Sequence, residues 1–128
     1  MMHDQIQEAI LDQQVMFLRY RDGRLRIVEP YCYWETPRGQ RMMRAYQRSG
    51  YSASGEAEGW KTFKVADIRG FKERGERFEL PPREGYSPFD MPVARFFAMI
   101  APDVPAWVNE APPVGQRRDD AGRRALAG

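Results

Sequence analysis

With 128 residues, 42% of them hydrophobic and 12% aromatic, the chain has the length of one folded domain and a composition that excludes a disordered protein. No apolar run approaches the ~18 residues that cross a bilayer, and the N-terminal stretch lacks the pattern of a signal peptide. We therefore expect no membrane partner and a cytoplasmic location. The single cysteine, Cys32, excludes an intrachain disulfide, and with one histidine, His3, a zinc site is not expected either; no cofactor is predicted.

The net charge is +2, but positive charge is concentrated between residues 17 and 48, where eight arginines face three acids, a net charge of +5. Seventeen of the 20 basic residues are arginine. A guanidinium group recognises carboxylate or phosphate through two parallel hydrogen bonds, so this distribution indicates an anionic partner. A GC-rich genome would produce the same arginine bias without any ligand.

The first part of the chain predicts a helix followed by a β-hairpin. Residues 4–13 place apolar side chains at helical spacing. Residues 15–20 and 24–29 have the composition and alternation of strands, and Asp22-Gly23 between them is a strong hairpin signal. The alternation predicts that Leu25 and Ile27 face the core and that Arg24 and Arg26 face solvent.

The middle of the chain predicts further short strands. Pro30 has no amide donor and predicts a strand end or an edge, with new strands at 31–35 and 40–48. In the second of these, the expected polar face carries Arg44, Tyr46 and Arg48, and the expected core face carries Met43 and Ala45. A polar loop at 49–59, a strand at 60–65, a single helical turn at 66–68 and a strand at 69–73 follow, with Phe78 and Leu80 as its extension. This spacing predicts a small barrel or sandwich.

The C-terminal part has a different character. Asp90, with Pro92 two residues on, predicts the start of a helix that runs from Met91 to Ala101. Its apolar side chains would close the open end of the barrel or form a homodimer interface. We expect one domain at 1–101 and a Pro-rich, disordered tail at 102–128 that includes Trp107.

Taken together, these segments resemble the WYL domain, a small SH3-like or Sm-like barrel usually attached to bacterial helix-turn-helix regulators. The likeness spans roughly residues 6–80. Glu29-Pro30 is similar to the Val-x-Pro signature of the family, and 61–68 is similar to its Arg-x-Phe-Arg-Leu-Asp-Arg-Ile signature. The strand that carries the Trp-Tyr-Leu motif corresponds to Arg41-Met42-Met43, so the naming motif itself is replaced. The resemblance implies a mostly-β barrel of about five strands with flanking helices, in a sensor that binds an anionic ligand and takes part in transcription regulation.

The predicted binding site combines basic and aromatic side chains on one barrel face. Such a face suits phosphate contacts and base stacking, whereas a solvated sheet covered by arginine stems would give the same pattern. The candidate ligand-binding residues are Arg24, Arg26, Arg41, Arg44, Tyr46, Arg48, Trp60, Lys61 and Lys64. The predicted function is a non-enzymatic sensor or binding module for a nucleotide or single-stranded nucleic acid.

Several alternatives remain open at this stage. The 49–59 loop is either a plain connector or a backbone nest for an anion. Cys32 is expected to be a buried structural thiol, and the acids Glu29, Glu35, Asp67 and Glu73 are expected to pair with arginines. The chain shows no nucleophile–base pair, metal set or cofactor fingerprint, so we do not expect an enzyme. The alternative function is a structural or protein-interaction module that self-associates through the apolar C-terminal helix.

Overall fold

The computed structural model describes residues 2–53 and 55–102. Within these residues it contains the following elements: α1 (Met2–Leu11), β1 (Gln14–Arg19), β2 (Leu25–Glu35), β3 (Arg41–Gly50), β4 (Gly59–Lys64), the 3₁₀ turn η1 (Val65–Asp67), β5 (Gly70–Arg77) and β6 (Arg95–Met99). The predictions of a mostly-β chain and of an N-terminal helix are confirmed. Trp107 and the rest of the predicted tail after Pro102 lie outside the described residues.

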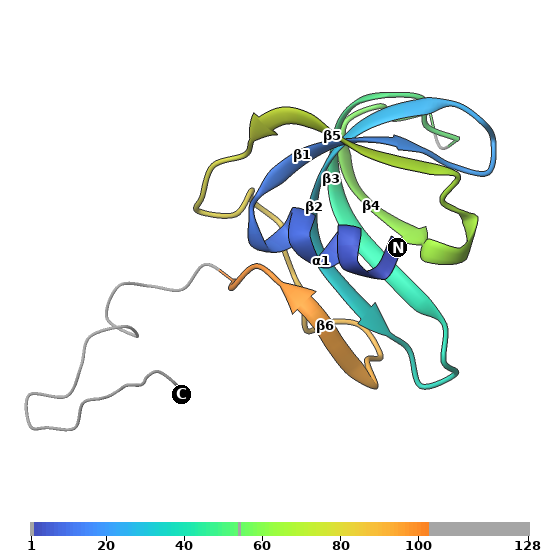
Figure 1. The fold of residues 1–128 in the computed structure, drawn as a ribbon. Helices are drawn as coiled ribbons and strands as arrows, with labels where there is room; N and C mark the ends of the chain where they lie inside the picture. The colour runs from blue at the N-terminus through green and yellow to red at the C-terminus, as the bar shows by residue number, and fades with distance from the viewer. Residues whose placement is uncertain (1, 54, 103–128) are drawn as a thin grey trace, which may run out of the picture.

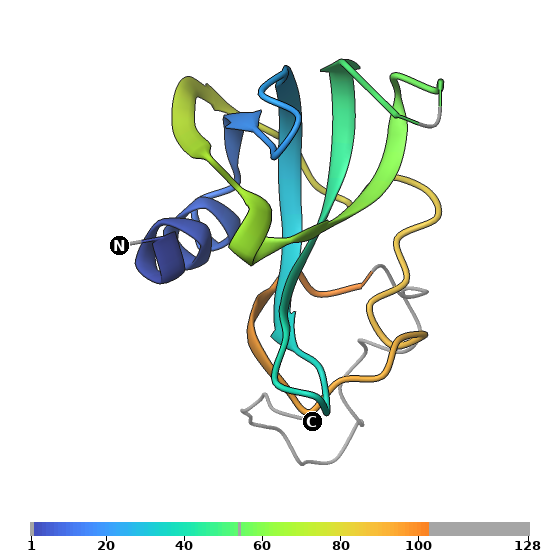
Figure 2. The same ribbon diagram turned by 90° about the vertical axis from the view of Figure 1, so that its right-hand side faces the viewer.

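The six strands form one antiparallel sheet in the order β4-β3-β2-β1-β5, and β6 pairs with β2. Strand β2 is long enough to pair with two strands along the same edge. Its first half pairs with β1, from Leu25 to Val28, and its second half pairs with β6, from Cys32 to Glu35. Figures 1 and 2 show the strands curving strongly, with α1 lying against one side of the sheet and contacting β1, β2 and β6.

The hairpin between β1 and β2 forms as the Asp22-Gly23 signal predicts. The amide of Gly23 donates to the carbonyl of Tyr20 (2.8 Å), and Gly23 has a φ of 76°, which favours glycine. The Asp22 carboxylate accepts the amide of Arg24 (2.9 Å). This turn fixes the register of the two strands, in which Phe17 faces Ile27.

Of the two expectations for Pro30, a strand end or an edge, the strand end is wrong, because β2 continues through it. Pro30 lies between the part of β2 that pairs with β1 and the part that pairs with β6, so no ladder partner on that edge requires its missing amide. A register shift in the pairing with β3 falls between Pro30 and Cys32. Proline is tolerated at such an irregularity, and the residues on either side of it remain in one strand.

The core lies between the curved sheet and the apolar face of α1. The alternation in β3 is as expected, because Met43 and Ala45 are fully buried. The expected alternation around the start of β2 fails at two positions, because Leu25 is 53% exposed and Arg26 is buried. Ile27 packs against the core and Arg24 is exposed, as expected. The largest fully buried apolar side chains are Ile6, Ile10, Val15, Leu18, Val28, Tyr31, Tyr33, Met43, Phe63 and Phe78.

The predicted C-terminal helix is wrong, because the structure has the strand β6 at Arg95–Met99. The apolar residues from Val93 to Ile100 fit helical spacing, but the strand satisfies its backbone against β2. Phe97 contacts Tyr33 on the side of α1, whereas Phe96 contacts Phe89 on the other side. The two neighbouring rings therefore point in opposite directions, as they do in a strand.

The segment after β5 crosses the outer face of the sheet, which is the face away from α1 (Figure 2). We call residues 78–90 the covering segment. Its Phe78 ring stacks on Tyr31 (centroids 5.0 Å apart), and Tyr86 Oη donates to the carbonyl of Ile100 (2.8 Å). No helix in the described part of the chain is long and apolar enough to cross a membrane.

Candidate functional site

One end of the sheet, next to the β1–β2 hairpin, is unusually polar for its depth. Arg26 retains only 6% of its surface there, and the neighbouring Gln47 is fully buried. The guanidinium of Arg26 donates to the Asp22 carboxylate (2.8 Å) and, over 3.4 Å, to the side-chain oxygen of Gln47. Its Nε is buried and has no hydrogen-bond partner in the described part of the chain. A charged group of this kind is expensive to bury, so its position calls for a functional or structural reason.

Aromatic rings surround the Arg26 guanidinium. Its Cζ atom lies 5.4 Å from the ring centroids of Tyr20 and Phe63 and 5.7 Å from that of Tyr51. Arg24 lies closer to Tyr51, with its Cζ 4.5 Å from the centroid. Contacts of a cation with the face of a ring are favourable, and they keep Arg24 and Arg26 close to the same tyrosine.

The loop between β3 and β4 covers this polar end from above. Gln47 Nε2 donates to the carbonyls of Tyr51 and Ala57 (both 2.9 Å), and Lys61 Nζ donates to the carbonyl of Glu56 (2.7 Å) and the hydroxyl of Ser52 (3.1 Å). The loop thus directs carbonyl oxygens toward these side chains. A nest for an anion requires amide groups instead, so the contacts favour the loop as a connector.

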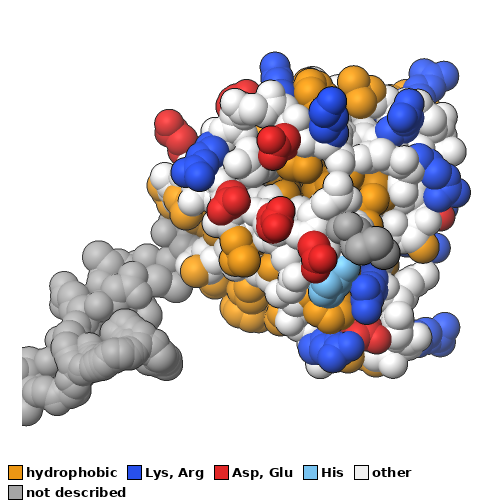
Figure 3. Space-filling model, viewed as in Figure 1, with side chains coloured by type: hydrophobic (Ala, Val, Ile, Leu, Met, Phe, Trp, Pro, Cys, Tyr) orange, Lys and Arg blue, Asp and Glu red, His pale blue; other side chains and the backbone are white. Residues whose placement is uncertain are grey.

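Positive charge exceeds negative charge at this end. Arg21 pairs with Asp67 (3.1 Å) and Arg26 pairs with Asp22, but Arg24 and Lys64 form no ion pair with any residue that the structure describes. The backbone amide of Arg24 and the guanidinium of Arg26 lower the pKa of Asp22, so this acid stays ionised. Figure 3 shows Lys and Arg side chains along the right-hand rim, where the hairpin and η1 lie in Figure 1, and acidic side chains along α1.

The amide of Lys64 donates to Tyr20 Oη (2.8 Å), and this hydrogen bond connects β4 to the hairpin. The basic and aromatic residues at this end of the sheet are here named the hairpin-end surface: Tyr20, Arg24, Arg26, Tyr51, Lys61 and Lys64. Four of the nine residues predicted from the sequence belong to it. Tyr20 and Tyr51 were not among those nine. Tyr20 ends the strand predicted at 15–20, and Tyr51 lies in the loop predicted at 49–59.

Four other predicted residues lie on the outer face, beneath the covering segment: Arg44, Tyr46, Arg48 and Trp60. Arg44 donates to the carbonyl of Ser87 (3.0 Å) and pairs with Asp90 (3.2 Å). The Trp60 indole donates to the carbonyl of Glu84 (2.9 Å), and its ring stacks on Tyr86 at 5.5 Å. These contacts occupy the groups that a phosphate or a base would use.

Tyr46 is engaged in the same way. Its hydroxyl donates to Glu58 (2.8 Å), a contact that raises the pKa of the phenol, and the Arg83 guanidinium lies 4.2 Å from its ring centroid. The last predicted residue, Arg41, lies elsewhere, close to His3 and over the ring of Phe97. The predicted cluster of nine residues is therefore divided among three places and does not form one patch.

Glu29, a buried carboxylate at the outer face, lies at the centre of a group of ion pairs that the sequence pattern does not indicate. Glu29 is 1% exposed and accepts hydrogen bonds from Arg83 Nε and Nη2 (both 2.8 Å) and from Arg48 Nε (2.6 Å). Burial alone would raise the pKa of Glu29, but hydrogen bonds and charge from both arginines outweigh it and lower the pKa. The pairing of Glu29 with arginine is as expected. Its partner Arg83 follows 54 residues later, and no local pattern in the sequence links the two.

The remaining candidates have structural surroundings. Cys32 is fully buried, as expected for a structural thiol, and burial raises its pKa to about 11. Glu35 pairs with Arg95 (2.9 Å) and Asp67 pairs with Arg21, whereas Glu73 is exposed and forms no ion pair among the described residues, so the expected pairing of Glu73 is wrong. The described residues contain no group of three His, Cys, Asp or Glu side chains that could hold a metal ion.

Comparison with known proteins adds no relative: no family model, no curated protein and no solved structure matches this chain.

Proposed function

We propose that the chain is a non-enzymatic binding module that takes an anionic, phosphate-bearing ligand, a nucleotide or a single-stranded nucleic acid, at the hairpin-end surface. We further propose that its curved sheet is an SH3/Sm-like barrel and a divergent relative of the WYL domain with a regulatory role. The strand order β4-β3-β2-β1-β5 supports the barrel. So does η1, after which the amide of Arg69 donates to the carbonyl of Arg19 (2.8 Å) and returns the chain to β1.

The observation that carries the proposal is the pair of guanidinium groups beside Tyr51. Arg24 and Arg26 lie 4.5 and 5.7 Å from the same ring centroid, and the ring itself is 37% exposed. Arg24 and Lys64 form no ion pair in the described part of the chain, so each is available to a phosphate of the ligand. A base or another planar group can contact the exposed part of Tyr51.

The depth of Arg26 supports a site at this end. Since Arg26 is held by Asp22 and Gln47 and bordered by rings, its guanidinium is already oriented before a ligand arrives. The uncompensated positive charge at this end is then that of Arg24 and Lys64, because Asp22 offsets the charge of Arg26.

Binding of labelled ligands tests the proposal. A labelled single strand of about 12 nucleotides and a labelled nucleoside triphosphate are titrated with the protein at about 50 and about 200 mM salt. We expect binding that weakens as salt rises, and weaker binding by the double variant Arg24→Ala/Lys64→Ala. The matched control, Arg38→Ala/Lys72→Ala, removes two exposed charges elsewhere. Absence of binding at low salt, or equal loss in both double variants, would contradict the proposal.

A second candidate is a protein-interaction module that self-associates through its C-terminal part, now with the strand β6 in place of a helix. One observation favours it: the Phe89 ring is 69% exposed and contacts only the edge of Phe96, 6.0 Å away, among the described rings. Sedimentation velocity of the wild type and of Phe89→Ser over a range of concentrations separates the cases. A monomer at every concentration for both proteins would exclude this candidate.

A further inference from the structure

A cleft opens at the end of β5, beside the covering segment. It has a volume of about 320 Å³ and is lined by Glu29, Arg48, Glu76, Arg77, Glu79 and Arg83. Three arginines and three glutamates give this cleft no net formal charge. It shares no residue with the hairpin-end surface, and its neutral balance does not select an anion.

Four of the six side chains neutralise one another. Glu29 forms the floor and pairs with Arg83 (2.8 Å) and Arg48 (2.6 Å), and Arg48 also pairs with Glu76 (2.7 Å). The side chain of Glu29 is 2% exposed, so packing holds it in place, and its two arginine partners are held by their ion pairs with it. These four side chains therefore already have partners of opposite charge.

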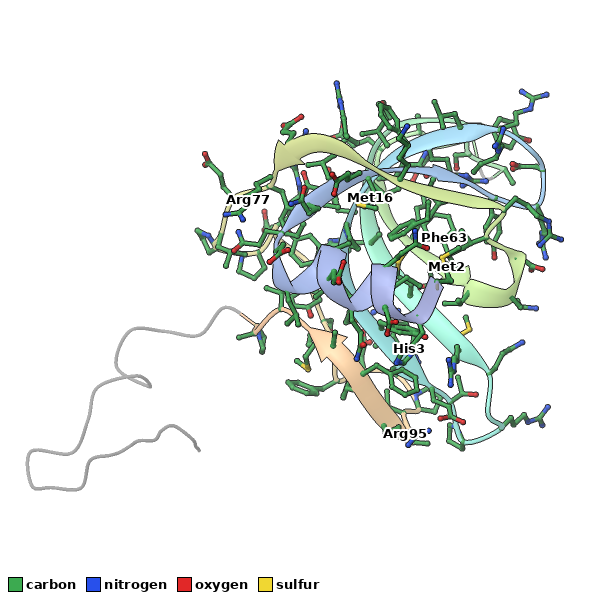
Figure 4. All side chains as sticks on the ribbon, viewed as in Figure 1. Met2, His3, Met16, Phe63, Arg77 and Arg95 are labelled. Atoms are coloured by element: carbon green, nitrogen blue, oxygen red, sulfur yellow. The ribbon has the colours of Figure 1, made fainter. Side chains whose placement is uncertain are left out.

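The other two side chains, Arg77 and Glu79, are exposed and form no ion pair within residues 2–53 and 55–102. Both flank Phe78, whose ring stacks on Tyr31 and which is 2% exposed, and both line the cleft. Figure 4 shows Arg77 at the end of β5, on the side of the molecule away from Phe63 and the hairpin-end surface.

The backbone between these two residues is held firmly. The amide of Phe78 donates to the carbonyl of Gln13 (2.8 Å), and the Gln13 side chain donates back to the carbonyl of Phe78 (2.8 Å). The Phe78 ring stacks on Tyr31. The backbone on either side of Phe78 is therefore held in place, and it carries one positive side chain, Arg77, and one negative side chain, Glu79, beside the same cleft.

We propose that this cleft binds a small zwitterion of the α-amino acid class, with its carboxylate on Arg77 and its ammonium on Glu79. A guanidinium binds a carboxylate through two parallel hydrogen bonds, and a glutamate accepts the hydrogens of an ammonium. A neutral ligand with both charges matches a cleft that has no net charge and one unused group of each sign. The volume is at the lower end of the range for small-molecule pockets, which suits a ligand of this size.

Titration followed by NMR chemical shifts tests this site, with L-alanine as the probe. Acetate and ethylammonium serve as the two single-charge halves, and inorganic phosphate as a plain anion. We expect L-alanine to shift the amides of residues 76–79 and 83 with a millimolar dissociation constant, and each half to bind about tenfold more weakly or worse. Arg77→Ala and Glu79→Gln should each weaken L-alanine binding by about tenfold, whereas the surface controls Arg38→Ala and Glu73→Gln should leave it unchanged.

Three outcomes would overturn the proposal. They are no shift at tens of millimolar L-alanine, binding of acetate or phosphate as tightly as L-alanine, and an equal effect of the surface controls. The wild-type oligonucleotide titration is independent of this result, because neither Arg77 nor Glu79 belongs to the hairpin-end surface.

Discussion

Replacing Glu29 by glutamine should destabilise the domain more than any other single loss of a carboxylate. The variant Glu29→Gln keeps the size of the side chain but leaves Arg48 and Arg83 facing a neutral amide. Removing one partner of a buried ion pair costs about 3–5 kcal/mol. Both arginines are partly solvated, with side chains 26% and 40% exposed, so we expect the lower end, about 3 kcal/mol.

Urea denaturation followed by tryptophan fluorescence measures this loss. With a slope of about 1.5 kcal/mol per molar urea, the midpoint should fall by about 2 M. The control is Glu73→Gln, which removes an exposed carboxylate that has no ion pair among the described residues and should change the free energy of unfolding by less than about 0.5 kcal/mol. A loss of less than about 1 kcal/mol for Glu29→Gln would refute the reasoning, because Glu29 would then behave as a surface acid.

The difference in free energy of unfolding between the wild type and Glu29→Gln should also depend on pH. The pKa of Glu29 is lowered in the folded protein, so its contribution to stability is complete above its unfolded pKa of about 4.3 and is lost as the pH falls through the folded value. The difference in free energy of unfolding between wild type and Glu29→Gln should therefore be constant from neutral pH down to about pH 5 and shrink below about pH 4. A difference that stays constant into strong acid would mean that Glu29 is not the titrating group.

Three further predictions concern other parts of the molecule. Gly50→Ala should destabilise the domain by about 3 kcal/mol or more, because an added Cβ would lie 2.5 Å from the Leu25 carbonyl oxygen at a φ of 109°. The control Gly55→Ala has a similar φ but open space around it, and it should lower the free energy of unfolding by only about 1 kcal/mol. Equal losses in urea denaturation would contradict the steric argument. Since burial raises the pKa of Cys32 to about 11, the native thiol should resist alkylation by iodoacetamide at pH 8 and react fully in urea, and fast labelling of the native protein would show that the thiol is exposed. Gly85→Val should disturb the Trp60 environment, because a Cβ there would lie 3.1 Å from the indole nitrogen; near-ultraviolet circular dichroism would detect the change, and an unaltered spectrum would contradict the contact.

Local chemistry in the sequence predicts much of this fold. Asp22-Gly23 places the first hairpin, alternation in β3 assigns Met43 and Ala45 to the core, and the turn after β4 appears as η1. Such features depend on neighbouring residues, so they are visible without tertiary structure. The WYL-like pattern of residues 61–68 stays a resemblance, because no comparison bears on it.

The errors arise where distant segments decide the outcome. Arg26 is buried because Tyr20, Tyr51 and Phe63 surround it, and no alternation rule registers three rings from three separate segments. The residues from 95 to 99 form a strand because β2 offers an edge beyond the end of β1, whereas their spacing alone also fits a helix.

The predicted cluster of nine residues is divided for a related reason. Side chains at alternate positions of β3 were expected to face solvent together, and Arg44, Tyr46 and Arg48 do share the outer face. The covering segment then occupies that face, and its contacts to Trp60 and Glu29 span 24 and 54 residues. The sequence shows no signal of this return, so it does not indicate that side chains on the outer face already have partners in the covering segment.

The salt dependence of single-strand binding tests the central claim most directly. If Arg24 and Lys64 each neutralise one phosphate, the logarithm of the association constant should fall with the logarithm of salt concentration at a slope of about −1.4. The variant Arg24→Ala/Lys64→Ala should have a slope of about zero, while Arg38→Ala/Lys72→Ala should match the wild type. A wild-type slope near zero, or the same slope for the hairpin-end variant and the wild type, would contradict binding at the hairpin-end surface.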